Sequence, residues 1–147
     1  MRPAVPDDLP DLARLHVLAR AAAVPRMPPS VHPPAEHRAW VEGWDLSAGA
    51  EHEVWVAALG AELVGLARFT PTWLDDLYVH PAHQGRGIGT VLLQTVQALR
   101  PGGFGAWVFT SNAPARAFYA AHGFVEVRHT DGSENEERAP DVEIRWP

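Results

Sequence analysis

The glycine-rich turn Gln84–Gly89 constrains this chain more than any other stretch, because of the segments on either side of it. The residues before it, Trp73–Val79, have the composition of a β-strand, and the residues after it, Thr90–Arg100, have the hydrophobic spacing of an amphipathic helix. Such a turn leaves backbone N–H groups without partners at the start of the helix. Because these donors and the helix dipole both favour an anion, we expect a phosphate-bearing ligand here.

The spacing of the glycines narrows the choice of ligand. A dinucleotide fingerprint requires G-x-G-x-x-G, and a P-loop requires G-x-x-x-x-G-K-[ST]. Here the glycines are Gly85, Gly87 and Gly89, and no Lys-Ser or Lys-Thr follows them, so neither motif is present. The alternative is a tight turn that only allows close helix packing. Glycine near a helix start costs roughly 0.5–1 kcal/mol relative to alanine, so three of them without a ligand would be unusual.

Two segments, in the correct order, resemble motifs of the GNAT family of N-acetyltransferases. Gln84, Gly87 and Gly89 occupy the defining positions of the family's Q/R-x-x-G-x-G/A loop, which binds acetyl-CoA in that family. The segment Asn112–Phe124 is similar to the family's Asn-x-x-Ala…Tyr…Gly-Phe segment. The resemblance covers nearly the whole chain, and its specific part is Trp73–Phe124.

Hydrophobic periodicity predicts an α/β fold with the element order β-α-α-β-β-β-α-β-α-β-β. The resemblance implies the GNAT acyl-CoA N-acyltransferase fold, a three-layer α+β arrangement with helices on both faces of a mixed, mostly antiparallel sheet. A proline-rich loop at 25–34 and a polar loop at 130–140 interrupt the pattern. Arg2–Ala4 resembles the first strand of the family. Helices are expected at about 7–22, 35–46, 90–100 and 112–122, and further strands at about 53–59, 63–69, 73–79, 105–109, 124–129 and 142–146.

Composition and charge exclude several classes of function. The 147 residues are expected to form a single domain, 1–147, and the absence of cysteine excludes disulfides and cysteine nucleophiles. A net charge of −6 argues against nucleic-acid binding, and no apolar run is long enough for a membrane span. A cytoplasmic location follows by default, since no signal-peptide pattern is present. His80 and His83 lack an obvious third ligand, so we expect no metal.

The resemblance implies transfer of an acetyl group from acetyl-CoA to a primary amine of a small molecule or peptide. The alternative is a noncatalytic acyl-CoA-binding or regulatory module on the same fold. Under either interpretation, the chain could form a homodimer. The residues expected to contact acetyl-CoA are Leu77, Tyr78, Val79, Gln84, Gly85, Arg86, Gly87, Ile88, Gly89, Thr90, Asn112, Ala115 and Arg116.

Tyr119 is the candidate general acid, because the matching tyrosine of the family lies near the sulfur and protonates the departing CoA thiolate. Alternatively, Tyr119 only packs in the core as an aromatic residue of an amphipathic helix, like its neighbour Phe118.

Strand alternation suggests the candidate base. Asp75 shares a face of the strand with Val79, where many members of the family carry the base or its water relay, so we prefer it over Asp76. A bulge in this strand would reverse the choice. Either aspartate could instead pair with an arginine, and bound water alone could carry the proton.

The acceptor site is expected in the N-terminal half. Met27, His32, Trp40 and Trp44 could form the wall of a pocket, although two tryptophans at helical spacing more often lie in a core. The acidic loop Glu134–Glu137 could attract a cation, or could simply be solvated.

Overall fold

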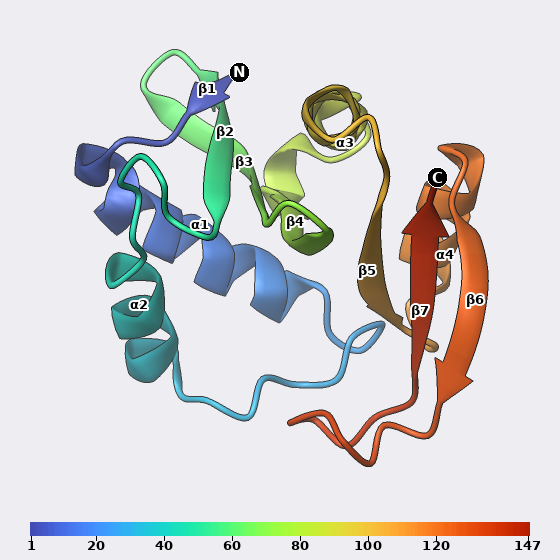
Figure 1. Cartoon of the computed structure of the whole chain (residues 1–147). Coiled ribbons are helices and arrows are strands. Elements are labelled where there is room, and N and C mark those ends of the chain that lie inside the picture. Colours follow the sequence, from blue (N-terminus) through green and yellow to red (C-terminus); the bar gives the residue numbers. More distant parts are fainter.

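A seven-stranded sheet runs through the computed structural model, which describes residues 1–147 (Figure 1). The strand order is β1-β2-β3-β4-β5-β7-β6, and every neighbouring pair is antiparallel except β4 and β5. The expected mixed, mostly antiparallel sheet is confirmed. The strands are β1 (Arg2–Pro3), β2 (Glu53–Leu59), β3 (Glu62–Phe69), β4 (Trp73–Val79), β5 (Phe104–Phe109), β6 (Val125–Thr130) and β7 (Asp141–Trp146).

Four α-helices accompany the sheet: α1 (Leu9–Ala22), α2 (Pro34–Glu42), α3 (Ile88–Leu99) and α4 (Ala113–Ala121). The order of helices and strands agrees with the order predicted from the sequence. The second helix ends four residues earlier than predicted, because Gly43 caps it and the chain turns there. That turn places Trp44 in the core beside Val41. No helix is both long enough and apolar enough to cross a membrane.

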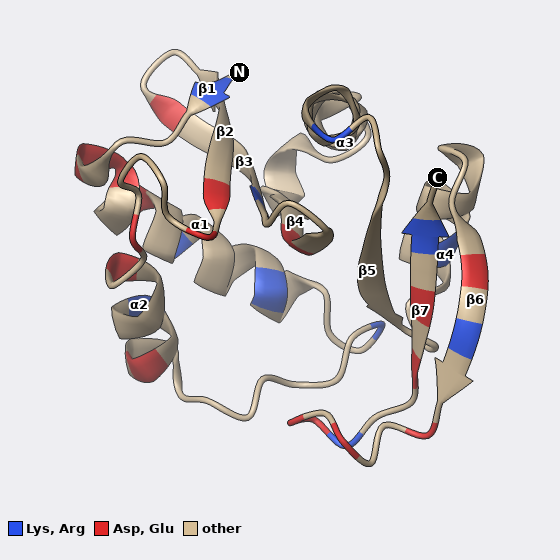
Figure 2. Cartoon of the chain, viewed as in Figure 1, with Lys and Arg blue, Asp and Glu red and all other residues tan.

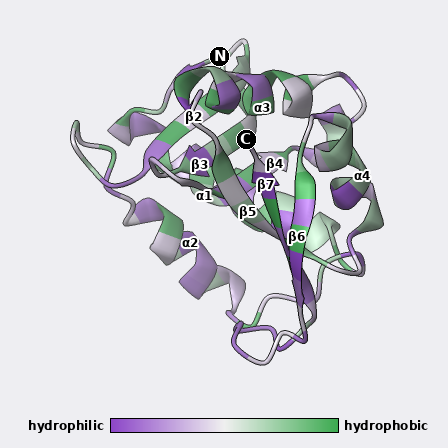
Figure 3. Cartoon of the chain, turned by 45° about the vertical axis from the view of Figure 1, so that its right-hand side comes forward, coloured by the Kyte–Doolittle hydropathy of each residue, from purple (hydrophilic) through white to green (hydrophobic).

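Two hydrophobic clusters cover the two faces of the sheet. On one face, α1 and α2 pack against β2 and β3 through residues such as Leu12, Val41 and Val56. On the other face, α3 buries Leu92, Leu93 and Val96 against β3, β4 and β5. Acidic residues lie on α2, at the start of α1 and in the loop between β6 and β7 (Figure 2). Hydrophobic and hydrophilic residues alternate along α3 and α4, as expected for helices with one buried side (Figure 3).

The strands β4 and β5 separate soon after they begin. Their parallel pairing is limited to Trp73 with Gly105 and Leu74 with Ala106. A side chain at position 105 would collide with the ring of Trp73, so glycine is needed where the strands are closest. Beyond Leu74 the edge of β4 that faces β5 has no partner strand, and this opening is visible near the centre of Figure 1.

A β-bulge in β4 corrects the alternation expected for this strand. Phe69 pairs with Leu74 and Arg68 pairs with Asp76, so Asp75 is an additional residue between them. A bulge puts two residues opposite one and reverses the faces of the residues that follow. Leu74, Leu77 and Val79 therefore pack on the α3 side, whereas Asp76 and Tyr78 face α1. Asp75 is the additional residue of this bulge, so alternation with Val79 no longer decides its position.

Two loops approach each other next to this opening. The loop between α1 and α2 and the loop between β6 and β7 meet where His32 Nε2 lies 3.1 Å from Glu136 Oε2. The first loop is also held by the Ser111 hydroxyl, which donates to the carbonyl of Arg26 at 2.5 Å. Residues far apart in the sequence thus close one side of the opening (Figure 1).

Candidate active site

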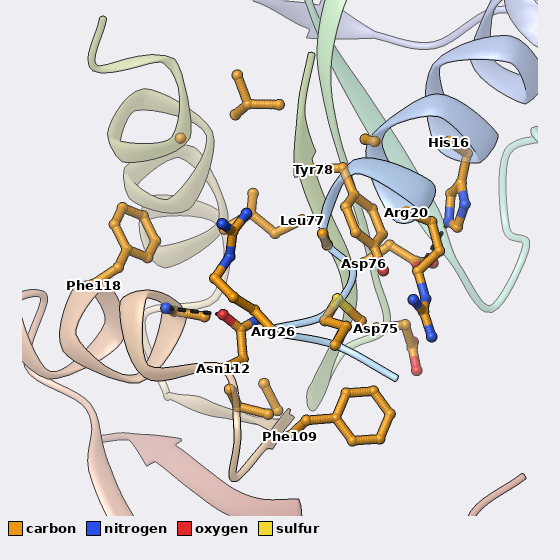
Figure 4. Close-up of a pocket in the computed structure, with 18 of the residues that line it drawn as sticks. His16, Arg20, Arg26, Asp75, Asp76, Leu77, Tyr78, Phe109, Asn112 and Phe118 are labelled. Carbon is orange, nitrogen blue, oxygen red and sulfur yellow. Dashed lines mark hydrogen bonds and ion pairs between the residues drawn. The ribbon is translucent and has the colours of Figure 1, made fainter. Parts of the chain in front are cut away.

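A cavity of about 1160 Å³ occupies the opening between β4 and β5 (Figure 4). One end is formed by the glycine-rich turn and the start of α3. One long wall comes from α4, and the opposite wall comes from β4 and α1. The two loops described above border the other end, where Met27 and Glu136 line the cavity. The cavity therefore joins the predicted cofactor turn to the N-terminal half of the chain.

The glycine-rich turn has the backbone conformation of an anion site. Gly85 and Gly87 have φ values of 78° and 79°, in the left-handed region that glycine adopts without strain. The first amide of α3 with an intrahelical partner is that of Val91, which donates to Gly87 O at 3.1 Å. The amides before it in the first turn therefore face outward at the positive end of the helix dipole. Such an end binds phosphate groups.

Most of the residues expected to contact acetyl-CoA line this cavity, and two do not. The exceptions are Arg86, whose Nη1 lies 3.4 Å from His83 Nδ1, and Arg116, which forms an ion pair with Glu126 at 2.8 Å. The other expected residues form its lining: Leu77, Tyr78, Val79, Gln84, Gly85, Gly87, Ile88, Gly89, Thr90, Asn112 and Ala115.

The α4 wall carries Tyr119. Asn112 begins this helix as predicted, because its Oδ1 accepts a hydrogen bond from the amide of Ala115. About two turns further on, Tyr119 lines the cavity and packs against Phe124, with ring centroids 5.1 Å apart. Burial raises the pKa of the Tyr119 hydroxyl, and the negative charge of Asp76 raises it further. The hydroxyl therefore stays protonated at neutral pH.

The opposite wall carries a buried chain of polar side chains that begins at Asp76. His16 Nε2 lies 3.1 Å from Asp76 Oδ1, and His16 Nδ1 lies 2.6 Å from His37 Nε2. A carboxylate only accepts hydrogen bonds, so His16 donates to Asp76 through Nε2 and accepts from His37 through Nδ1. Burial, together with the nearby His16 and Arg20, lowers the pKa of His37 to about 4. His37 is therefore neutral near pH 7.

The two oxygens of Asp76 have different surroundings. Oδ1 accepts from His16, whereas Oδ2 is buried, has no hydrogen-bond partner and lies 3.6 Å from Arg68 Nη1. Asp75, by contrast, is bound by His52 Nε2 at 2.9 Å and is one-third exposed. Both aspartates line the cavity, and burial together with Asp76 raises the pKa of Asp75. Only Asp76 offers a buried oxygen without a partner.

Sequence reasoning missed several side chains of this wall. His16, Arg20 and His37 line the cavity, and so does Glu137 from the β6–β7 loop. One signal was present, because His16 occupies a position on the buried side of the first helix, where a polar residue needs a partner. Of the four residues suggested for the acceptor pocket, Met27, His32 and Trp40 line the cavity, whereas Trp44 is in the core.

Comparison with known proteins agrees with this architecture. Residues 50–126 match the family model described as "Acetyltransferase (GNAT) domain". The chain therefore belongs to the GNAT acetyltransferase family. Over 74 residues it is 36% identical to mycothiol acetyltransferase of Amycolatopsis mediterranei (strain U-32), a match that covers 46% of this chain. The matched part is 24% of that relative, so the chain spans about a quarter of its length.

Solved structures show the same fold along almost the whole chain. The solution structure of the apo form of YjaB from Escherichia coli has a TM-score of 0.76 and 19% identity, covering 99% of this chain and 95% of that one. The PaiA N-acetyltransferase of Thermoplasma acidophilum, in complex with coenzyme A, has a TM-score of 0.72 and 17% identity, covering 99% of this chain and 96% of that one. At these identities the likeness concerns the fold.

Proposed function

We propose that this protein transfers an acetyl group from acetyl-CoA to a primary amine. The observation that carries the proposal is the arrangement of one continuous cavity. Outward-facing amides of α3 lie at one end, and Tyr119 and Asp76 stand on its two long walls. Acetyl transfer from a thioester needs an anchored donor, a base for the amine and an acid for the thiolate. This cavity has a group for each of the three.

The donor would lie along β4. Its pyrophosphate would accept hydrogen bonds from the amides at the start of α3, where Gly87 takes a left-handed conformation. Its pantetheine amides would pair with the edge of β4 that β5 leaves open beyond Leu74. This path brings the thioester toward Tyr119, whose protonated hydroxyl can donate a proton to the departing thiolate sulfur.

Asp76 is the proposed base in place of Asp75. Its unpartnered Oδ2 would accept a proton from the acceptor ammonium, and the neutral nitrogen would then attack the thioester carbon. The carbon–sulfur bond breaks as the tetrahedral intermediate collapses, and the thiolate takes a proton from Tyr119. The attacking nitrogen then loses its second proton, which restores the Tyr119 hydroxyl, and the proton on Asp76 passes to solvent. His16 is a positioning residue, since its hydrogen bond to Oδ1 fixes the orientation of the Asp76 carboxylate.

The test is release of CoA from acetyl-CoA in the presence of a panel of primary amines, followed with a thiol reagent. The chain contains no cysteine, so the released CoA is the only thiol in the reaction. Acceptor-dependent release is expected. Tight binding of CoA without release for any amine would support the noncatalytic acyl-CoA-binding module instead.

A further inference from the structure

Arg20 is a charged side chain of the cavity wall that the proposed reaction does not use. It extends from α1 along the same wall as Asp76 (Figure 4), and it lines the cavity. Its side chain is only 8% exposed. The guanidinium nitrogens Nη1 and Nη2 are both buried and have no hydrogen-bond partner.

An arginine that only stabilises a fold normally uses its donors. Arg2, for example, binds Asp8 through two hydrogen bonds of 2.7 and 2.9 Å. The one carboxylate within 4 Å of Arg20 is that of Glu137, at 3.7 Å, which is too long for a hydrogen bond. Leaving a buried donor without a partner costs about 1–3 kcal/mol. The guanidinium of Arg20 can therefore donate hydrogen bonds to a ligand, because the protein supplies no hydrogen-bond acceptor for it.

The position of Arg20 limits the size of the ligand that could bind its guanidinium. Arg20 lies one helical turn after His16 on α1, and His16 Nε2 lies 3.1 Å from Asp76 Oδ1. Arg20 and Asp76 are therefore neighbours on this wall, yet they form no ion pair with each other. A small molecule with a positive and a negative group a few atoms apart could reach both.

We propose that the acceptor is an amino acid or a short peptide whose carboxylate binds Arg20 while its amine lies at Asp76. This inference rests on the proposed acetyl transfer and names the class of its acceptor. The guanidinium fork matches a planar carboxylate through two parallel hydrogen bonds. The carboxylate of Glu137, 3.7 Å from Arg20, disfavours a doubly charged phosphate at the same place. Glu137 occupies the approach to Arg20, and the carboxylate of the acceptor would replace it.

Matched acceptors test the proposal. Amino acids, β-amino acids and dipeptides are each compared with their carboxamides, which keep the amine and the size but lose the negative charge. CoA release should be more efficient for the acids, by on the order of 10- to 100-fold in kcat/KM, the range of a charge-assisted hydrogen bond. All twelve basic residues of the chain are arginines, so acetylation of its own lysines cannot contribute to the signal.

Three variants identify the residue responsible. Arg20→Gln should remove the preference for acids, so that each acid and its carboxamide have similar kcat/KM values. Arg14→Gln, on the exposed side of the same helix, is the matched control and should behave as the wild type. Glu137→Gln removes the competing carboxylate and should lower KM for the acids only. This variant therefore tests carboxylate binding at Arg20 even if Arg20→Gln does not fold.

Three results would overturn the inference. Equal or faster acetylation of the carboxamides by the wild type would show that no carboxylate is recognised, while the proposed acetyl transfer would stand. Absence of CoA release with every acceptor would count against both. An acid preference that survives in Arg20→Gln, with unchanged CoA binding, would exclude Arg20 as its source.

Discussion

His16 Nε2 lies 3.1 Å from Asp76 Oδ1, although sixty positions separate the two residues in the chain. The hydrogen bond joins α1 to β4 across the sheet face that α1 covers, and both side chains are nearly buried, at 5% and 11% exposure. It leaves Asp76 Oδ2 as the oxygen without a partner. This contact is what separates Asp76 from its neighbour Asp75 as a candidate base.

Replacing Asp76 with asparagine should lower kcat by on the order of 100-fold, the lower end of what general-base catalysis contributes. CoA affinity should stay close to that of the wild type, because the residue lies far from the glycine turn. The matched variant Asp75→Asn changes a carboxylate that is one-third exposed and bound by His52, and it should retain most of the activity. Steady-state kinetics at saturating acetyl-CoA measures both. A larger loss for Asp75→Asn would return the role to Asp75.

Tyr119→Phe should lower kcat by about 100-fold while CoA binding changes little, because only the proton donor is lost. The ring packing against Phe124 is retained in this variant. Kinetics and calorimetric titration with CoA separate the two effects. Phe118→Leu, on the same helix, is a control for altered packing. Unchanged turnover of Tyr119→Phe would show that Tyr119 is only an aromatic residue of the core.

Gly87→Ala should weaken CoA binding by about 5- to 30-fold, which corresponds to the roughly 1–2 kcal/mol cost of a left-handed conformation in a non-glycine residue. Gly87 has a φ of 79°, and no atom within 4 Å would meet the added methyl group, so the effect comes from the backbone alone. Gly102→Ala also has open space around it, without a positive φ, and should bind CoA normally. Titration calorimetry compares the two, and equal affinities would rule out a strained cofactor turn.

The low pKa of His37 predicts a pH dependence of stability. Its pKa is lowered from 6.5 to about 4, so the unfolded chain binds more protons than the folded one between these values. The contribution of His37 to the free energy of unfolding is thus fully present above pH 6.5 and is lost as the pH falls toward 4.

Urea unfolding of the wild type and of His37→Gln over this pH range measures the difference. The fall in stability on acidification should be smaller in His37→Gln. His129→Gln, which alters an exposed histidine, should follow the wild type. Parallel curves for wild type and His37→Gln would show that His37 does not resist protonation in the folded state.

Much of the fold follows from local patterns in the sequence. The glycine turn between Val79 and Ile88, the order of helices and strands, and the capping of α4 by Asn112 each depend on residues close together in the chain. Hydrophobic periodicity and turn-forming residues are properties of neighbouring positions in the chain, so these features can be predicted from the sequence. The donor end of the cavity could be predicted for the same reason.

The polar contacts at the other end of the cavity, where we propose that the acceptor binds, could be identified only from the tertiary structure. The bulge at Asp75 arises from the register between β3 and β4, and it brings Leu74 to the same face as Leu77 while Asp76 faces α1. The contacts of Asp76 with His16, and of Arg20 with Glu137, join residues from distant parts of the chain. Hydrophobic spacing indicates that a residue is buried, but it does not indicate which polar partner it meets. The sequence by itself therefore determined the topology and the glycine-rich turn, and only the packing of α1 and two loops against β4 decided which polar side chains meet in the cavity.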